Sequence, residues 1–329
     1  MPRVAVIFTG GTISMGFDPV AGGNVPSLDG AAILARTPGL DAIADVVAID
    51  RGLTPASHFT FPDLMTLRGV IAGALDDTSI DGAVVVQGTD TIEETAFAWD
   101  LTLDSPKPVV VTGAMRASHE EGYDGPANLR RSVAAAASTS LREAGVVVSL
   151  AGTLEAADDV TKMHTRAFDT FQSPNRGSLG RVGEDGSVTV MAPRGPRRHL
   201  RLVPSDGARV ELIQAGIGSD GAMIDAAVAT GARGVVVAAT GAGNTSKGLL
   251  TAAERALADD VVVVLASRCP SGAVSDAYAF PGGGATWVRA GAIPTGTLCA
   301  IKARIAVALG IGAGLGRSEL TDLLADPLG

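Results

Sequence analysis

The sequence predicts an α/β protein with two domains, a larger N-terminal doubly wound sheet and a smaller C-terminal α/β domain. Short apolar runs recur along the chain, and each is followed by glycine or threonine and then by a helical pattern. Runs that are apolar throughout are typical of parallel strands covered on both faces. A Pro-rich stretch without periodicity, residues 191–208, interrupts the alternation. We therefore expect a catalytic domain over residues 1–190, a linker, and a second domain over residues 209–329.

Eight segments carry the strand pattern, and they are Val4–Phe8, Val46–Ile49, Ala83–Val86, Val109–Val111, Val146–Leu150, Val210–Ile213, Val235–Ala239 and Val261–Ala266. Helical periodicity marks Pro62–Leu75, where proline opens the first turn, and the Ala-rich segment Pro126–Leu141. Thr91 and Glu94 fit a capping box at the start of a helix that runs to about Leu103.

Composition excludes several classes of function. The net charge is −9, from 26 Lys and Arg against 35 Asp and Glu, which argues against nucleic-acid and anionic-membrane partners. The arginines at 194, 197, 198 and 201 are interpreted as part of a solvated linker. The apolar run near the N-terminus is short for a secretory signal, and no stretch approaches the roughly 18 apolar residues of a membrane span. We expect a soluble, cytoplasmic protein.

The metal-binding residue types are sparse. Cys269 and Cys299 are the only cysteines, so neither a disulfide framework nor a cysteine-based zinc site is expected. The four histidines are scattered without metal-ligand spacing, at His58, His119, His164 and His199. We expect neither a metal nor a cofactor.

The first chemical motif follows the first predicted strand, with the residues T-G-G-T-I-S from Thr9 to Ser14. Two glycines allow the backbone to approach a ligand closely and leave N–H groups free to form an anion nest. Thr12 presents a hydroxyl behind them. By itself the motif is equally typical of an ordinary turn, and the absence of a following Gly-Lys-Ser/Thr excludes a P-loop.

A second motif, Q-G-T-D-T from Gln87 to Thr91, places two hydroxyls and a carboxylate at a helix N-terminus. Helix capping alone would explain one such residue. Lys162, one of only four lysines, follows the last predicted strand of the N-terminal part. A lysine can be deprotonated when buried, but a surface ion pair with Asp158 or Asp159 is the simpler alternative.

Taken together, these motifs resemble the bacterial-type L-asparaginases and glutaminase-asparaginases. The resemblance rests on T-G-G-T-I, on Q-G-T-D-T-I-E-E-T-A, on G-A-M-R followed by D-G-P-A-N-L, and on D-D-V-T-K, in this order. It extends from Val4 to about Leu309. The resemblance implies an amidohydrolase that converts L-asparagine to L-aspartate and ammonia without a cofactor.

The resemblance also assigns roles to single residues. It makes Thr12 the nucleophile and forms a relay from Thr89, Asp90 and Lys162, in which a neutral lysine takes the hydroxyl proton. Backbone N–H groups around Gly88 would stabilise the oxyanion. The remaining substrate-binding positions that it implies are Gly11, Ser57, His58, Asn244 and Tyr278.

Several of these positions carry further implications. Ser57 matches the serine that holds the substrate α-carboxylate, and His58 stands where many relatives have glutamine or another polar residue. Asn244 resembles an asparagine that a neighbouring subunit lends to the site, which implies a homodimer or homotetramer with shared active sites. Tyr278 is the nearest equivalent of a glutamate that many relatives direct to the substrate ammonium, with Asp276 two residues earlier.

One expected feature is missing from the loop after Thr12. Relatives usually carry a tyrosine there, whereas Gly16–Ser27 contains Phe17 and no tyrosine. The preference between asparagine, glutamine and another small amide therefore stays open. A non-catalytic amino-acid-binding relative is a second possibility, favoured by the missing tyrosine and glutamate.

Two other readings compete. Residues 216–221 form a G-x-G-x-x-G between a predicted strand and a helix, which is typical of dinucleotide binding. The following strand, however, ends in Thr240 and Gly241 where an acidic residue would be needed for the ribose. A tRNA-linked amidotransferase subunit would be expected to have an additional N-terminal domain, and T-G-G-T begins here at residue 9.

Overall fold

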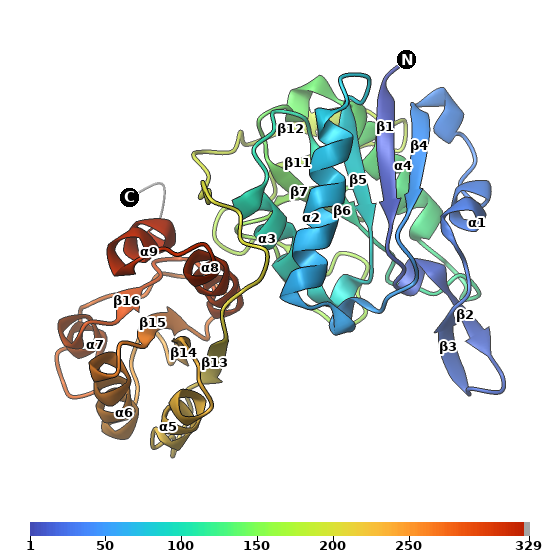
Figure 1. The fold of residues 1–329 in the computed structure, drawn as a ribbon. Helices are drawn as coiled ribbons and strands as arrows, with labels where there is room; N and C mark the ends of the chain where they lie inside the picture. Colours follow the sequence, from blue (N-terminus) through green and yellow to red (C-terminus); the bar gives the residue numbers. More distant parts are fainter. Residues whose placement is uncertain (326–329) are drawn as a thin grey trace. The chain divides into compact units, whose positions relative to one another are not determined.

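The computed structural model describes residues 1–325 and confirms the α/β architecture with two domains. The chain divides into two compact units, Met1–Arg194 and the part from Gly195 onward (Figure 1). All eight predicted strands are present. Within residues 1–325, no helix combines the length and apolarity needed to cross a bilayer.

The N-terminal unit contains an eight-stranded sheet in the order β12-β11-β8-β7-β6-β5-β1-β4. Its parallel strands are β4 (Asp45–Asp50), β1 (Arg3–Phe8), β5 (Gly82–Val86), β6 (Val109–Thr112) and β7 (Val146–Leu150). Antiparallel strands extend one edge, and these are β8 (Thr153–Ala156), β11 (Gly180–Val182) and β12 (Val188–Val190). All residues of β5, β6 and β7 are buried, as their predominantly apolar sequences require.

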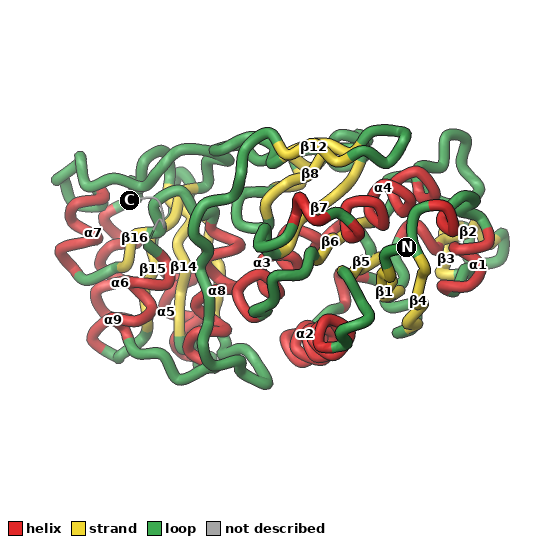
Figure 2. The backbone as a smooth tube through the Cα atoms, turned by 90° about the horizontal axis from the view of Figure 1, so that it is seen from above, coloured by secondary structure: helices red, strands yellow, loops and turns green. Residues whose placement is uncertain are grey.

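Helices cover both faces of this sheet. They are α1 (Gly30–Ala35), α2 (Phe61–Asp76), α3 (Ile92–Thr102) and α4 (Gly125–Ala137). Figures 1 and 2 show α2 and α4 on opposite faces of the strands around β5. Leu129 and Val133 of α4 pack into one apolar cluster with alternate residues of β1, Val4 and Val6. The sheet is therefore doubly wound, as predicted.

The strand order places a topological switch point between β1 and β5. From β1 the chain moves to one side to form β4, and then crosses to the other side for β5, β6 and β7. The last residues of β1 and β5, Phe8 and Val86, are paired in register. Crevices outside the carboxyl ends of strands at such a point are where α/β sheets bind ligands.

Two predictions about helix ends are wrong. Thr91 makes no side-chain cap for α3, and its hydroxyl donates instead to the Ala56 carbonyl at 3.1 Å. The helix predicted to end at Leu141 ends at Ala137 and is followed by a separate 3₁₀ turn. Ser138 interrupts it in an extended conformation and caps that turn through its side chain.

The second unit is a parallel sheet in sequential order, β13 (Val210–Gln214), β14 (Gly234–Ala239), β15 (Val262–Ser267) and β16 (Ile293–Pro294). Its helices are α5 (Ala222–Ala229), α6 (Lys247–Ala258), α7 (Gly284–Ala290), α8 (Ala300–Gly312) and α9 (Arg317–Leu324). A Cβ on Gly221 would lie 2.6 Å from the Cβ of Ala252 in α6. Gly221 is therefore explained by helix packing. The strands of this sheet follow one another in sequential order, so the sheet has no reversal of strand order at β13, and such a reversal is where dinucleotides bind.

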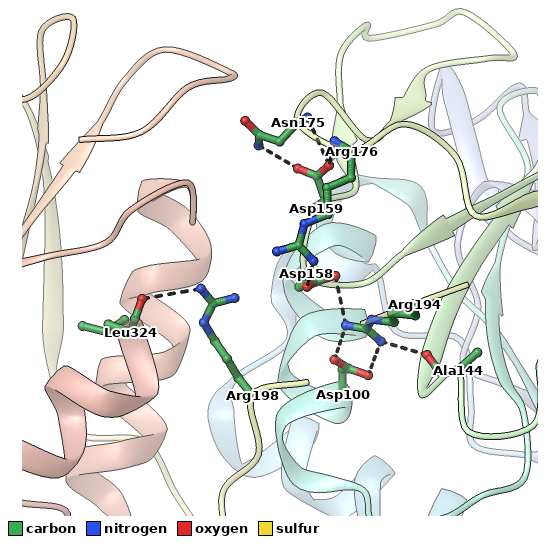
Figure 3. Close-up of polar contacts among 9 residues, drawn as sticks. All are labelled: Asp100, Ala144, Asp158, Asp159, Asn175, Arg176, Arg194, Arg198 and Leu324. Atoms are coloured by element: carbon green, nitrogen blue, oxygen red, sulfur yellow. Dashed lines mark hydrogen bonds and ion pairs between the residues drawn. The ribbon is translucent and has the colours of Figure 1, made fainter. Parts of the chain in front are cut away.

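The interpretation of the arginines near residue 194 as a solvated stretch is wrong for two of them. Arg194 and Arg198 are both buried. Arg194 forms ion pairs with Asp100 and Asp158, and Arg198 Nη2 donates to the Leu324 carbonyl at 3.5 Å (Figure 3). Composition indicates an irregular segment, but it does not show which distant partners the arginines meet after folding.

Candidate active site

The loops that follow β1 and β5 touch each other through glycines. A Cβ on Gly11 would lie 2.1 Å from the backbone nitrogen of Gly88, and Gly11 has a φ of +94°. A Cβ on Gly88 would in turn lie 3.0 Å from the Cβ of Ala56. Three loops therefore meet at the switch point, and no larger residue fits at position 11.

Thr12 is the first residue of a short 3₁₀ helix, Thr12–Ser14, and is half-buried. The turn is fixed by Ser14, whose hydroxyl donates to the Gly11 carbonyl at 2.7 Å. Within the described part of the chain, the Thr12 hydroxyl makes no hydrogen bond. Its oxygen is thus available to a ligand at the switch point.

Tyr123 supports the same turn and was not identified by the sequence motifs. Its hydroxyl donates to the Ile13 carbonyl at 2.7 Å. Burial raises the pKa of Tyr123 to about 12, so the phenol keeps its proton and remains a donor. The loop after Thr12, which contains no tyrosine, forms a hairpin of β2 (Met15–Asp18) and β3 (Gly23–Pro26), in which Phe17 is exposed.

Lys162 contacts both Thr89 and Asp90 in the loop after β5, as the predicted relay requires. Its Nζ lies 2.9 Å from Thr89 Oγ1 and 2.8 Å from Asp90 Oδ1. The lysine side chain is 14% exposed, whereas that of Asp90 is 75% exposed. An ion pair to so exposed a carboxylate adds little stability, so this contact is better explained by orientation of the lysine.

The alternative prediction, a surface ion pair of Lys162 with Asp158 or Asp159, is wrong. Asp158 pairs with Arg176 and Arg194, while Asp159 accepts hydrogen bonds from Asn175. Lys162 itself lies in the short strand β9 (Thr161–Lys162), which pairs with β10 (Phe171–Gln172). A cavity of about 260 Å³ adjoins the lysine and is lined by Asp90, Lys162, Met163, His164 and Thr165.

Ser57 and His58 lie on the third of the converging loops. They belong to a 3₁₀ turn, Ala56–His58, and both are exposed. The hydrogen bond from Thr91 to the Ala56 carbonyl ties this turn to the loop that carries Thr89. The structure therefore places both residues beside the Gly11–Gly88 contact, on the solvent side.

The segment D-G-P-A-N-L, residues 124–129, has a structural role. Asp124 accepts hydrogen bonds from the backbone nitrogens of Met115 and Arg116 at 3.0–3.1 Å. Asn128 donates to the Gly113 carbonyl at 3.0 Å and accepts from the Ala151 nitrogen at 3.1 Å. These two side chains hold the loops after β6 and β7 and do not belong to the relay.

Asn244 and Tyr278 lie in the second unit, on two loops that are joined to each other. The Ser275 nitrogen donates to the Ala242 carbonyl at 2.9 Å, which connects the loops. Asn244 forms an isolated bridge with Thr240, and its Oδ1 is buried with no hydrogen-bond partner among residues 1–325. Tyr278 is exposed, with its ring centroid 6.0 Å from that of Phe280.

No three His, Cys, Asp or Glu side chains in residues 1–325 gather in a way that could hold a metal ion. The groups that the site offers for chemistry are its hydroxyls, its lysine and its backbone N–H groups. A hydroxyl beside a hydroxyl–lysine pair can serve as a nucleophile, and free N–H groups can stabilise an oxyanion.

The comparison with known proteins decides the family. The profile described as "Asparaginase, N-terminal" matches residues 3–194, and the profile described as "Glutaminase/Asparaginase C-terminal domain" matches residues 209–324. The chain belongs to the asparaginase family. Family membership, together with the sequential strand order of the second unit, argues against the dinucleotide-binding reading.

Individual relatives agree with this assignment over nearly the whole chain. The "Probable L-asparaginase" of Deinococcus radiodurans is 36% identical, over 97% of this chain and 96% of the relative. "L-asparaginase 2" of Escherichia coli is 32% identical, over 94% and 89%. The crystal structure of a "Probable Cytoplasmic L-asparaginase" from Campylobacter jejuni has a TM-score of 0.88 at 27% identity, over 98% and 99% of the two chains.

Proposed function

We propose that this chain hydrolyses the side-chain amide of L-asparagine to L-aspartate and ammonia. The observation that carries the proposal is the contact of Lys162 Nζ with Thr89 Oγ1 and Asp90 Oδ1, beside the Gly11–Gly88 contact that presents Thr12. Full-length relatives named L-asparaginase support the choice of substrate.

In the proposed reaction, Thr12 Oγ attacks the amide carbonyl. The hydroxyl proton passes through Thr89 to neutral Lys162, and Asp90 orients the lysine. Backbone N–H groups around Gly88 and Thr89 would stabilise the oxyanion. Collapse of the tetrahedral intermediate breaks the C–N bond, and the departing nitrogen takes the proton and leaves as ammonia. Water then hydrolyses the aspartyl ester on Thr12 and releases L-aspartate.

The proposal extends to substrate binding and assembly. Ser57 and His58 are expected to meet the α-carboxylate of the substrate. Asn244 and Tyr278 belong to the second unit, and we propose that a neighbouring chain supplies them in a homodimer or homotetramer with shared sites. The buried, unpartnered Oδ1 of Asn244 supports a role beyond the monomer, because such groups are normally hydrogen-bonded. A cytoplasmic location is proposed from the C. jejuni relative.

A second candidate activity is hydrolysis of glutamine. The description of the C-terminal family, which names glutaminases as well as asparaginases, favours it. A non-catalytic amino-acid-binding role is less well supported, because Thr12, Thr89, Asp90 and Lys162 are all present and three of them are in contact.

Ammonia release from L-Asn, L-Gln and D-Asn by the purified protein tests the proposed activity. We expect the highest kcat/KM for L-Asn, with L-aspartate formed in equal amount. A higher kcat/KM for L-Gln would establish the glutaminase alternative. Binding of L-Asn without ammonia release would establish the non-catalytic one.

A further inference from the structure

A buried arginine lies outside the residues assigned to catalysis. The side chain of Arg194 is 3% exposed. Its Nη1 and Nη2 donate to the two oxygens of Asp100 at 2.8 and 2.7 Å, and Nη1 also donates to the Ala144 carbonyl at 2.9 Å. Nη2 lies 3.0 Å from Asp158 Oδ1. Figure 3 shows the guanidinium between these partners, so that one side chain joins three segments.

The buried charges of this cluster compensate one another through ion pairs. Asp100 and Asp158 are buried, and Asp158 Oδ2 also accepts a hydrogen bond from Arg176 Nη1 at 3.0 Å. Burial lowers the pKa of Arg194, but the carboxylates of Asp100 and Asp158 raise it above its ordinary value. The guanidinium is therefore permanently charged. Its removal would leave two buried carboxylates without this cation, which is strongly unfavourable.

The two acids that Arg194 joins belong to the two segments that meet at the catalytic lysine. Asp158 precedes Lys162 by four residues, and Asp100 lies in α3, the helix that begins two residues after Asp90. Lys162 Nζ contacts Asp90 at 2.8 Å. The same two segments are thus connected twice, once through Lys162 and once through Arg194.

The residues between Asp158 and Lys162 are held firmly. Asp159 accepts hydrogen bonds from Asn175 Nδ2 at 2.7 Å and from the Arg176 nitrogen at 2.8 Å (Figure 3). Val160 is completely buried. A displacement of Asp158 is therefore passed along the chain to Lys162, because the intervening residues cannot readily absorb it.

We propose that Arg194 is a positioning residue, which holds the Lys162 segment against α3 so that Lys162 Nζ stays within hydrogen-bonding distance of Thr89 Oγ1. This inference rests on the proposed amidase function. A planar guanidinium can bind both oxygens of Asp100 and still reach Asp158, whereas the ammonium of a lysine at position 194 cannot reproduce that fork.

Two variants and a matched control test the proposal. Arg194→Lys keeps the positive charge but removes the two-nitrogen contact with Asp100. Asp158→Asn keeps the pair of Arg194 with Asp100 and weakens the ion pair of Arg194 with the segment that carries Lys162. Arg255→Lys is the control, since Arg255 also contacts both carboxylate oxygens of one aspartate: its Nη2 lies 2.9 and 2.7 Å from the oxygens of Asp225, on the surface of the other unit.

The readouts are kcat and KM for L-Asn and the ¹³Cε resonance of Lys162 in lysine-labelled protein, assigned through Lys162→Met; the wild type has four lysines and each Arg→Lys variant has five. All are measured well below the Tm of each variant. We expect Arg194→Lys and Asp158→Asn to move the Lys162 resonance and lower kcat about ten- to a hundredfold, with KM within about threefold, because small misplacements of a catalytic group have effects of that size. Arg255→Lys should change neither.

An unchanged Lys162 resonance and kcat, with only a lower Tm, would show that Arg194 serves stability alone and would overturn the proposal. If Arg194→Lys does not fold, Asp158→Asn decides by the same readouts. A wild-type protein without activity on L-Asn would refute the proposed function, while the resonance would still decide whether Arg194 positions Lys162.

Discussion

At the scale of single residues, the site depends on contacts that only small side chains allow. Gly11 combines a φ of +94° with a backbone approach in which any Cβ would overlap Gly88. This approach brings the loop of Thr12 against the loop of Thr89 without an intervening side chain. The hydroxyl at position 12 then projects from a turn that Ser14 and Tyr123 hold through the carbonyls of Gly11 and Ile13.

The raised pKa of Tyr123 leads to a prediction about pH. The folded state keeps the phenol proton where the unfolded chain loses it, so this group contributes stability below pH 10, and the contribution is lost as the pH rises toward 12. Tyr123→Phe should lower the free energy of unfolding near neutral pH by about 1 kcal/mol through the lost hydrogen bond. It should also show a smaller decline in stability across that alkaline range, as measured by urea unfolding.

The protein has two tyrosines, so Tyr278→Phe leaves Tyr123 as the only phenol and permits a direct check. Near-ultraviolet absorbance of that variant should show ionisation with a midpoint of about pH 12. A midpoint near pH 10, where an exposed tyrosine ionises, would contradict the burial of the phenol against the Thr12 turn.

The sequence singled out Thr12, Thr89 and Asp90 in motifs directly after predicted strands and Lys162 in the segment D-D-V-T-K, and the resemblance to the asparaginases implied their roles. It did not identify Tyr123 or Arg194. Tyr123 meets Ile13 across 110 residues and Arg194 meets Asp100 across 94. Local periodicity and composition carry no information on such long-range polar pairs, which form only when the sheet brings the segments together.

At the scale of secondary-structure elements, two N-termini with similar sequence signals behave differently. The predicted capping box at Thr91 does not form, because its hydroxyl is used to join the loop at Ala56. A capping box that was not predicted forms at α2, where Thr60 and Asp63 satisfy each other. At Thr91 a tertiary contact prevented the capping box. The box at Thr60 and Asp63 has the expected spacing and could have been predicted from the sequence.

The α2 capping box gives a prediction at this scale. Thr60→Ala should lower the free energy of unfolding by about 0.5–2 kcal/mol, because a backbone N–H at the helix start loses its acceptor. Thr66→Ala is the control, since Thr66 is exposed on the same helix, and it should leave stability unchanged or slightly higher. Equal loss of stability in both variants on urea unfolding would contradict a capping role for Thr60.

At the scale of the whole molecule, the strand order determines where the chemistry lies. The wholly apolar strands were predictable, and so was their doubly wound arrangement. The order β4-β1-β5 was not, since nothing in the local pattern states which neighbour each strand takes. That order creates the switch point at which the loops carrying Thr12 and Thr89 meet. Asn244, in contrast, belongs to the second unit, and the role proposed for it depends on assembly.

Mixing of subunits tests that role. Thr12→Ala and Asn244→Ala should each be nearly inactive alone. If a neighbouring chain supplies Asn244, refolding the two together in equal amounts should restore about a quarter of wild-type activity, because half of the dimers are hybrids and each hybrid holds one intact site. No recovery, in a sample that sedimentation shows to contain hybrid oligomers, would mean that each chain completes its own site.

The most direct test of the account is the turnover of L-Asn by Thr12→Ala, Thr12→Ser and Lys162→Met, measured as ammonia release from folded protein. A nucleophile and its base act as one unit, so Thr12→Ala and Lys162→Met should each lower kcat by about a thousandfold or more. Thr12→Ser retains a hydroxyl and should keep measurable activity. Retention of more than about a tenth of wild-type turnover by Thr12→Ala would contradict the assignment of Thr12 as the nucleophile.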